Sequence, residues 1–219
     1  MTIYLDECQA GCDASDIGFP HVLLCMAVVL QTGAWLYGYH FDKPANTNEY
    51  AGALLNFIQR KGGDVANGVR LYGCCHHYNR NTNRKPPAGD AHAAWRAEMQ
   101  QIAATLGYHG RVSGFDTSII DPQQGTYIEF HREQGTNRCR IYYKRHEKIA
   151  HNVQTIRPQN FAPVGTGNVD TWKPTSAQGA GAGSWISNRS LTTSADLKPG
   201  ATKWHELDYA LRLTTFRAP

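Results

Sequence analysis

The stretch GFPHVLLCMAVVLQTGAWLYGYHF, residues 18–41, contains two apolar runs separated by turn-forming residues at 31–33. Two such runs around a turn predict a hairpin. In the second run, successive side chains would point to opposite faces of a strand. His40 then shares a face with Leu36 and Gly38, while the aromatic side chains occupy the other face. We expect the aromatic face to pack on the core and the His40 face to leave space for a substrate chain beside the imidazole.

The remaining segments alternate between helical and extended patterns. The run 21–30 is too short for periodicity to separate a buried strand from a short helix. Asn46 with Glu49 is a capping signal for a helix that Gly62 and Gly63 would end. The complete expectation is a strand at 2–5, a loop at 7–18, helices at 46–61 and 90–106, an exposed loop at 79–89, and strands at 69–75, 111–115, 126–131 and 139–144. This order predicts an α+β fold, a layered sandwich of a mostly antiparallel mixed sheet with two main helices.

Length and composition favour one domain over residues 1–219. Apolar residues make up 41% of the chain and charged residues 18%, which is ordinary for a folded protein. A core at 1–150 would be followed by a Gly/Ser/Thr-rich extension at 151–219. Much of that extension, from 157 to 199, is expected to form a long loop, and a final strand at 204–216 is expected to return to the core.

Targeting and membrane segments are not evident in the sequence. The N-terminal residues MTIYLDECQ lack the cationic start and apolar core of a signal peptide. The longest apolar run, 22–30, is about half of a membrane span. Synthesis in the cytoplasm is therefore expected. On this compartment argument we expect the six cysteines to be free thiols.

Cys25 and His40 are the two groups that amide hydrolysis by a thiol requires. An imidazole can take the thiol proton and hold it, which leaves a thiolate nucleophile. From spacing alone, the alternative is a buried apolar cysteine and an unrelated histidine at a strand end. The order of the surrounding elements favours the catalytic interpretation.

In pattern, residues 1–145 resemble the bacterial chemoreceptor glutamine deamidases of the CheD type and the catalytic domains of the cytotoxic necrotising factors. After an N-terminal strand, an apolar segment is opened by a cysteine (LLCMAVVL), and a strand carries a histidine before an aspartate-containing turn (GAWLYGYHFDKP). A helix that ends in glycine then leads into a strand (YAGALLNFIQRKGGDVANGVRLYGCCH). The next helix leads into three strands (MQQIAATLGYHGRVSGFDT, GTYIEFHR, CRIYYKR).

This resemblance implies a cysteine-dependent protein glutamine deamidase with Cys25 as the nucleophile and His40 as the general base. The enzyme would need no cofactor and no metal, and transglutamination would be a side activity. The resemblance also implies a bacterial hydrolase, and the long extension favours a toxin or virulence effector that is secreted without a signal peptide into a target or host cell. Its partners would be a substrate protein and an immunity or chaperone protein, with no membrane and no nucleic acid, and we expect a monomer.

The third catalytic member has no clear counterpart. Chemoreceptor deamidases have a glycine-serine step before the cysteine, where this chain has Leu23 and Leu24, and a threonine that orients the histidine, near Phe19 of this chain. Ser15 and Asp16 are therefore tentative third members. A backbone carbonyl, as in the necrotising factors, is the other candidate.

The cluster Cys74, Cys75, His76 and His77 supports alternative chemistries. Alternate residues of a strand face opposite sides, so the four side chains would not converge on one metal ion. Cys75 with a downstream histidine is an alternative nucleophile. A cysteine amidase or peptidase, for example a cell-wall amidase, would instead use Cys25 with His76 or His77.

A basic, tyrosine-rich hairpin supports a function of another class. The favoured interpretation of this hairpin is a solvated face; as the next choice, a non-catalytic interaction protein would bind an acidic protein partner through it. RNA or single-stranded DNA is a less favoured ligand, because no nucleic-acid-binding module accompanies the hairpin. Its residues are Arg132, Arg138, Arg140, Tyr142, Tyr143, Lys144, Arg145 and Lys148.

Overall fold

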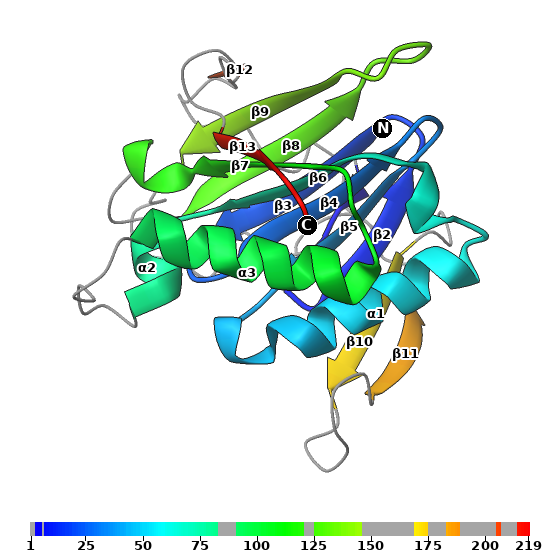
Figure 1. Cartoon of the computed structure of the whole chain (residues 1–219), viewed down its shortest axis with the longest axis horizontal. Coiled ribbons are helices and arrows are strands. Elements are labelled where there is room, and N and C mark those ends of the chain that lie inside the picture. The colour runs from blue at the N-terminus through cyan, green and yellow to red at the C-terminus, as the bar shows by residue number, and fades with distance from the viewer. Residues whose placement is uncertain are drawn as a thin grey trace.

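The chain forms two β-sheets and a layer of helices (Figure 1). A computed structural model describes residues 3–5, 7–82, 91–120, 125–145, 169–174, 183–188, 205–206 and 214–219. In spatial order, the larger sheet contains β11 (Gly183–Asn188), β10 (Val169–Pro174), β2 (Gln9–Asp13), β5 (Leu36–Phe41), β4 (Met26–Thr32), β6 (Gly68–Cys75), β7 (Arg111–Asp116) and β13 (Thr214–Arg217). The smaller sheet contains β1 (Ile3–Tyr4), β3 (Asp16–Val22), β8 (Thr126–Arg132), β9 (Cys139–Arg145) and β12 (His205–Glu206).

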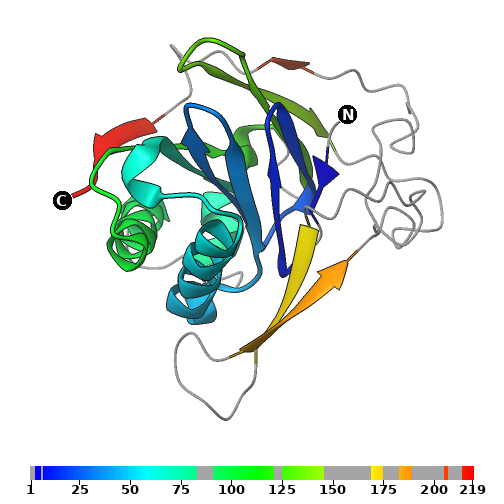
Figure 2. The same ribbon diagram turned by 90° about the vertical axis from the view of Figure 1, so that its right-hand side faces the viewer.

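The helices cover one face of the larger sheet, and the smaller sheet covers the other face (Figure 2). The helices are α1 (Thr47–Arg60), α2 (His77–Thr82) and α3 (Ala91–Leu106), with short 3-10 turns at Pro44–Asn46, Val65–Asn67 and Thr117–Ile119. On the helical side, the indole N–H of Trp95 in α3 donates to the carbonyl of Gly73 in β6 at 3.0 Å. On the other side, the rings of Tyr72 and Phe130 lie 5.4 Å apart between the two sheets. The layered α+β prediction is confirmed.

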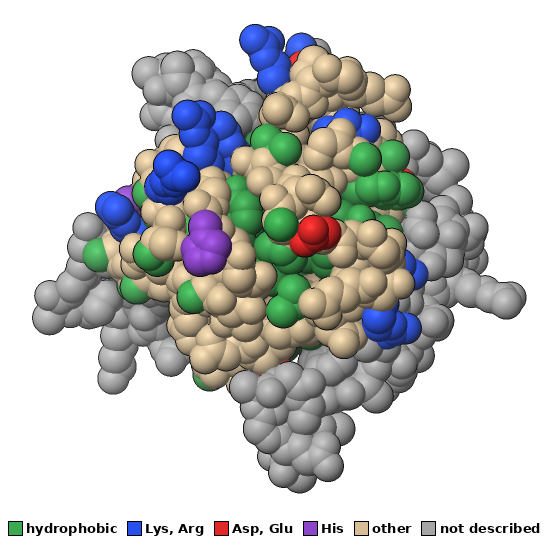
Figure 3. All heavy atoms as spheres, turned by 45° about the vertical axis from the view of Figure 1, so that its right-hand side comes forward, with side chains coloured by type: hydrophobic (Ala, Val, Ile, Leu, Met, Phe, Trp, Pro, Cys, Tyr) green, Lys and Arg blue, Asp and Glu red, His purple; other side chains and the backbone are tan. Residues whose placement is uncertain are grey.

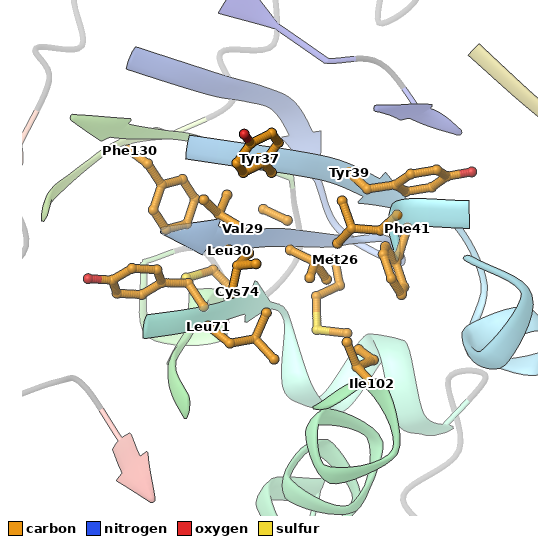
Figure 4. Packing of buried hydrophobic residues seen from close by; sticks show 14 of the residues in the cluster. Met26, Val29, Leu30, Tyr37, Tyr39, Phe41, Leu71, Cys74, Ile102 and Phe130 are labelled. Carbon is orange, nitrogen blue, oxygen red and sulfur yellow. The ribbon is translucent and has the colours of Figure 1, made fainter. Parts of the chain in front are cut away.

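Strand β4 lies at the centre of this sandwich. All seven of its residues are buried, because each face of the strand is covered by a different layer. Figure 4 shows Phe130 of the smaller sheet and Ile102 of α3 approaching β4 from opposite sides. A run that is buried on both faces reads as continuously apolar, which is why MAVVL shows no alternation.

The strand pairing is mostly antiparallel, as predicted. Of the pairs between described strands, β1–β3 and β6–β7 are parallel and the others are antiparallel. The hairpin predicted around 31–33 joins β4 to β5. The run 21–30, left open between strand and helix, contains the end of β3, a bend at 23–25 and most of β4.

The loop predicted at 7–18 is wrong, because β2 and the start of β3 occupy most of it. Its small and polar residues lack strand propensity, but β2 pairs with β5 and β3 pairs with β8. Sheet pairing therefore overrides local composition. The buried side chains of Ala10 and Cys12 confirm that this is a core segment.

The face of β5 that carries His40 is not open, so the predicted space for a substrate beside the imidazole is wrong. A Cβ atom on Gly38 would lie 3.0 Å from both Leu5 and Phe19, which shows how closely the smaller sheet packs on this face. The opposite face is the predicted aromatic core face, where Tyr39 and Phe41 pack against Tyr50 of α1.

The predicted helices are present, but two details of their surroundings differ. Asn46 forms no side-chain cap on α1; its amide donates to the hydroxyl of Tyr50 at 3.3 Å instead. The segment 79–89 was predicted to be a loop, but its first residues belong to α2. Residues 83–90 lie outside the described residues.

The C-terminal part contributes strands at both edges of the larger sheet. β10 pairs with β2, and β13 pairs with β7, so the end of the chain pairs with the core. The single strand predicted at 204–216 is wrong in extent, because its described residues belong to two strands, β12 on the smaller sheet and β13 on the larger sheet. The long loop predicted for 157–199 contains β10 and β11, and its other residues lie outside the described ones. Among the described residues, every helix is too short or too polar to cross a lipid bilayer.

Candidate active site

Cys25 and His40 are in direct contact. The Nε2 atom of His40 lies 2.9 Å from the Sγ atom of Cys25, within hydrogen-bonding distance. The two residues are 15 positions apart in sequence. Cys25 ends the bend that connects β3 to β4, and His40 is the penultimate residue of β5. Because β4 and β5 are antiparallel neighbours, the start of one strand meets the end of the other.

The pair lies at one end of the interface between the two sheets. His40 shares its face of the larger sheet with Gly38, and the ring of Phe19 contacts the imidazole edge-on at 5.7 Å. Cys25 and His40 are each only 1% exposed. Leu24, immediately before the cysteine, is 38% exposed. Solvent therefore reaches the residue next to the nucleophile candidate, while the sulfur itself is covered.

A backbone carbonyl holds the other side of the imidazole. The Nδ1 atom of His40 lies 2.8 Å from the carbonyl oxygen of Leu5. A carbonyl can only accept, so Nδ1 carries the proton and Nε2 presents its lone pair to Cys25. The thiol then donates to Nε2, which is the arrangement that a general base needs.

The same segment also fixes the backbone of His40. The N–H of Cys8 donates to the carbonyl of His40 at 2.9 Å. Cys8 has a φ of 63°, in the left-handed region that non-glycine residues rarely occupy. This conformation turns the chain sharply after Leu5, so that one short segment contacts both the ring and the main chain of His40.

Neither Ser15 nor Asp16 takes the third position, so that tentative assignment is corrected. The hydroxyl of Ser15 donates to Asp13 at 2.9 Å, and Asp16 forms an ion pair with His131 at 3.2 Å. Both belong to the turn that connects β2 to β3. The side of the imidazole that they were expected to hold is occupied by the Leu5 carbonyl, which is the alternative that the sequence left open.

Burial dominates the electrostatics of Cys25 and raises the pKa of its thiol to about 12. The carboxylate of Glu7 raises the pKa further. Backbone N–H groups of Leu23 and Cys25, together with the positive charge of Arg80, lower it. The resting thiol is therefore protonated, and a thiolate would form by transfer of its proton to His40.

A buried ion pair lies beside this site, and sequence reasoning missed it. Arg80 of α2 is 2% exposed and Glu98 of α3 is 7% exposed. The guanidinium binds both carboxylate oxygens, with Nε at 2.8 Å and Nη2 at 2.6 Å. Thr47 of α1 donates to the same carboxylate at 2.5 Å. One feature of the sequence could have indicated a buried carboxylate: Glu98 lies next to Trp95 and Met99 of the apolar stripe of α3.

Arg80 also reaches the backbone on either side of the cysteine–histidine pair. Its Nη1 atom donates to the carbonyl of Leu24 at 2.9 Å and to that of Asp42 at 2.6 Å. Leu24 directly precedes Cys25, and Asp42 follows His40 by two residues. The guanidinium therefore bridges the two chain segments that carry the pair.

The residues from Cys74 to His77 do not form one cluster. Cys74 faces the smaller sheet, because it shares a face of β6 with Tyr72. His76 accepts from the N–H of Asn79 at 3.2 Å, at the start of α2. His77 stacks on Trp95 with 5.0 Å between ring centroids and lies 3.8 Å from Asp116. Within the described part of the chain, no group of three potential metal ligands is close enough to hold an ion.

Two arginines of the basic hairpin are engaged within the protein. Arg132 donates to the carbonyls of Ala14 and Gly33, and Arg140 pairs with Glu133. Lys148 lies outside the described residues. On the face shown in Figure 3, Lys and Arg side chains are dispersed and do not form one continuous stripe.

No model of a known protein family matches this chain, and no curated protein matches it by sequence.

Proposed function

We propose that this protein is a cysteine-dependent amidohydrolase that deamidates glutamine side chains of a target protein. The observation that carries the proposal is the contact between Cys25 and His40, whose imidazole is held by the Leu5 carbonyl in the tautomer that accepts the thiol proton. A cysteine beside a base that is itself oriented by a third group has the arrangement of an activated nucleophile.

The reaction would proceed in two halves. His40 takes the thiol proton, and the sulfur of Cys25 attacks the carboxamide carbon of a glutamine. The C–N bond then breaks, and His40 returns the proton to the departing ammonia, which leaves a thioester. Water adds to the thioester with His40 as the base, the C–S bond breaks, and the products are glutamate and the free thiol.

Backbone N–H groups are candidates to stabilise the oxyanion in both halves. The N–H groups of Leu23 and Cys25 lower the thiol pKa and therefore lie close to the sulfur. Donors in that position also lie near the oxygen that develops charge when the sulfur attacks.

The choice of glutamine in a protein target rests on the resemblance of the order of elements to that of the glutamine deamidases. In the same proposal the protein is a bacterial toxin or effector, and the converted glutamine gains a charge that would disable its target. The Cys25 thiol is buried, so the bend at 23–25 has to shift for a side chain to reach the sulfur. A long, unbranched carboxamide side chain needs a smaller shift than a peptide backbone would.

The proposal is tested by labelling Cys25 with a small thiol-reactive electrophile across a range of pH, with each cysteine resolved by tandem mass spectrometry. We expect the rate at Cys25 to fall about tenfold or more in His40→Ala, because the base that accepts the thiol proton is lost. His109→Ala, which removes an exposed imidazole hydrogen-bonded to Pro219, is the matched control.

Equal labelling rates of Cys25 in the wild type and in His40→Ala would contradict the proposal. Thermal unfolding of both variants is measured in parallel, so that exposure of the thiol by unfolding is recognised. Cys74 provides an internal reference, because it is buried and its thiol pKa is also raised to about 12 by burial.

A further inference from the structure

The guanidinium of Arg80 is placed to set the geometry of the site without touching the substrate. It donates four hydrogen bonds, two to the carboxylate of Glu98 and one each to the carbonyls of Leu24 and Asp42. Arginine presents its donors in a rigid plane, so these contacts are mutually constrained. Displacing one of them would displace the others.

The contact with the Leu24 carbonyl has a specific consequence for Cys25. The peptide bond between the two residues is trans, since the described chain has no cis bonds, and a trans peptide is planar. Fixing the direction of the Leu24 carbonyl therefore fixes the Cys25 N–H in the opposite direction. Donation to that carbonyl also polarises the peptide and makes its N–H a stronger donor.

We propose that Arg80 is a positioning residue that aims the Cys25 N–H at the developing oxyanion and holds the bend at 23–25 against the end of β5. This inference rests on the proposed amidohydrolase function. Glu98 and Thr47 serve it indirectly, because their contacts fix the plane of the guanidinium. The helical layer is thereby coupled to the site through one side chain.

Two variants separate the geometry of Arg80 from its charge. Arg80→Lys keeps the positive charge but cannot hold both carbonyls and the carboxylate in one plane. The double variant Arg80→Met with Glu98→Met replaces the buried pair by apolar side chains of similar length, a change that buried pairs often tolerate. Glu98→Gln is the matched control, since it perturbs the same network and retains the guanidinium.

In the Lys variant we expect kcat for a glutaminyl substrate to fall about tenfold with little change in KM, because the oxyanion donor loses its alignment. The pH midpoint of Cys25 labelling should stay near that of the wild type. In the double Met variant the midpoint should move to higher pH, because Arg80 lowers the thiol pKa. A purely structural role would instead lower thermal stability in all three variants without a selective loss of kcat.

An unchanged kcat in a folded Arg80→Lys protein would overturn the inference, as would an unchanged labelling midpoint in the double Met variant. The pH midpoint of Cys25 labelling can be measured without a substrate. If the wild type shows no deamidation while the midpoint shifts as expected, the proposed function fails and the coupling between Arg80 and Cys25 stands.

A second inference concerns the opposite end of the larger sheet. A cavity of about 430 Å³ lies there, lined by Arg70, Tyr72, Glu133, Asn137, Arg138, Cys139 and Arg140. Arg70 and Cys75 lie at opposite ends of β6, about 17 Å apart along the strand, and Cys75 is next to the start of β4. This cavity is therefore distinct from the Cys25–His40 site.

Positive charge accumulates beside this cavity. Arg70, Arg111 and Arg217 are in register on β6, β7 and β13, so their side chains share one face of the sheet. Like charges directly opposite one another destabilise a sheet. No ion pair joins any of the three to another described residue. Within the cavity, the only carboxylate among the lining residues, Glu133, is paired with Arg140.

The geometry points to a binding site for a phosphate group, carried either by a small molecule or by a phosphorylated side chain. Three lining arginines against one glutamate leave an excess of two positive charges, which matches a phosphate dianion. The planar guanidinium forks suit its oxygens, and the amide of Asn137 adds a neutral donor. The volume lies within the range of ordinary small-ligand pockets.

Calorimetric titration of the full chain at constant ionic strength tests this site, with inorganic pyrophosphate, ATP and a phosphoserine peptide as probes and sulfate as the reference anion. We expect saturable binding of at least one phosphate probe, weakened about tenfold or more in Arg70→Gln. Arg96→Gln is the control, because Arg96 lies on α3 over the ring of Phe216.

Binding of pyrophosphate or ATP alone would identify a small-molecule ligand, and tighter binding of the peptide would identify a phosphorylated partner. No saturable binding of any probe, or equal binding by the wild type and Arg70→Gln, would overturn the inference.

Discussion

His40 shows how a single backbone contact can decide the chemistry of a side chain. Its Nδ1 proton is held by the Leu5 carbonyl, so the lone pair of Nε2 faces the Cys25 thiol. The histidine remains able to accept a second proton there, because both nitrogens then act as donors and both partners can accept. This residue therefore supports base and acid steps without rotating.

The carboxylate of Glu7 disfavours formation of the Cys25 thiolate, and its removal should therefore favour the thiolate. Its carboxylate raises the pKa of the buried Cys25 thiol after the larger effect of burial. We expect Glu7→Gln to shift the pH midpoint of Cys25 labelling to lower pH. Glu133→Gln, at the β8–β9 connection, provides a control for loss of a carboxylate elsewhere. A midpoint that moves to higher pH in Glu7→Gln would contradict this reading of the site.

His131 should make stability depend on pH in a predictable direction. Burial alone would lower its pKa, but the carboxylates of Glu129 and Asp16 outweigh burial and raise it. Its contribution is therefore complete below the unfolded pKa of about 6.5 and is lost as the pH rises through the higher folded value.

Urea unfolding of His131→Gln tests this dependence. The variant should lose more stability relative to wild type at pH 5.5, about one unit below the unfolded pKa, than at about pH 9. Gly33→Ala, which changes no titratable group and adds an atom where nothing lies within 4 Å, is the control. A loss that is larger at the higher pH would show that the ion pairs with Asp16 and Glu129 do not stabilise the fold.

For individual residues, the sequence predicted the pair Cys25 and His40 but not the groups that hold the pair in place. Cys25 and His40 could be paired because they flank a hairpin, and antiparallel strands bring such positions together. Leu5 could not be identified, because a backbone carbonyl has no side-chain signature. Arg80 lies in a polar, basic, proline-containing segment whose composition predicts an exposed loop. Its burial could not be predicted, because its partner Glu98 is 18 residues away and on another helix.

The elements show where local propensity is sufficient and where it is not. Helices α1 and α3 follow from their apolar spacing, and each ends one or two residues before a glycine with positive φ, Gly62 or Gly107. Strand β2 could not be predicted, because its sequence QAGCD has little strand propensity and its pairing with β5 and β10 is a tertiary property.

Packing between α3 and the sheet depends on the absence of a side chain at Gly114. A Cβ atom there would overlap the indole of Trp95 and the backbone carbonyl of Gly73. We expect Gly114→Ala to lower the free energy of unfolding by about 3 kcal/mol, as overpacking in a core does. Gly33→Ala should have little effect, because nothing lies within 4 Å of the added atom. Urea unfolding measures both, and an equal effect of the two substitutions would contradict the packing described for α3.

The whole molecule relies on burial and hydrogen bonds without covalent cross-links. All six cysteines are free, as predicted from the sequence. We therefore expect the melting temperature to be the same with and without a thiol reductant. A lower melting temperature in the reductant would show that a disulfide contributes to the fold in solution.

At the scale of the molecule, the order of elements was enough to predict a layered α+β sandwich. It was not enough to predict two separate sheets, because the sequence does not state which strands pair. The separation of the strands into two sheets is the reason why the site is buried. The smaller sheet supplies Phe19 against the imidazole, and β1 precedes the Leu5 carbonyl that holds it, so the site is buried between the layers.

The most direct test of the central claim is a proteome-wide search by mass spectrometry for glutamine converted to glutamate. Lysate from candidate target cells is incubated with the wild-type protein or with Cys25→Ser. The account predicts gains of about 1 Da at specific glutamines, present with the wild type and absent with Cys25→Ser and His40→Ala. No conversion with the wild type, or the same conversion with Cys25→Ser, would contradict it.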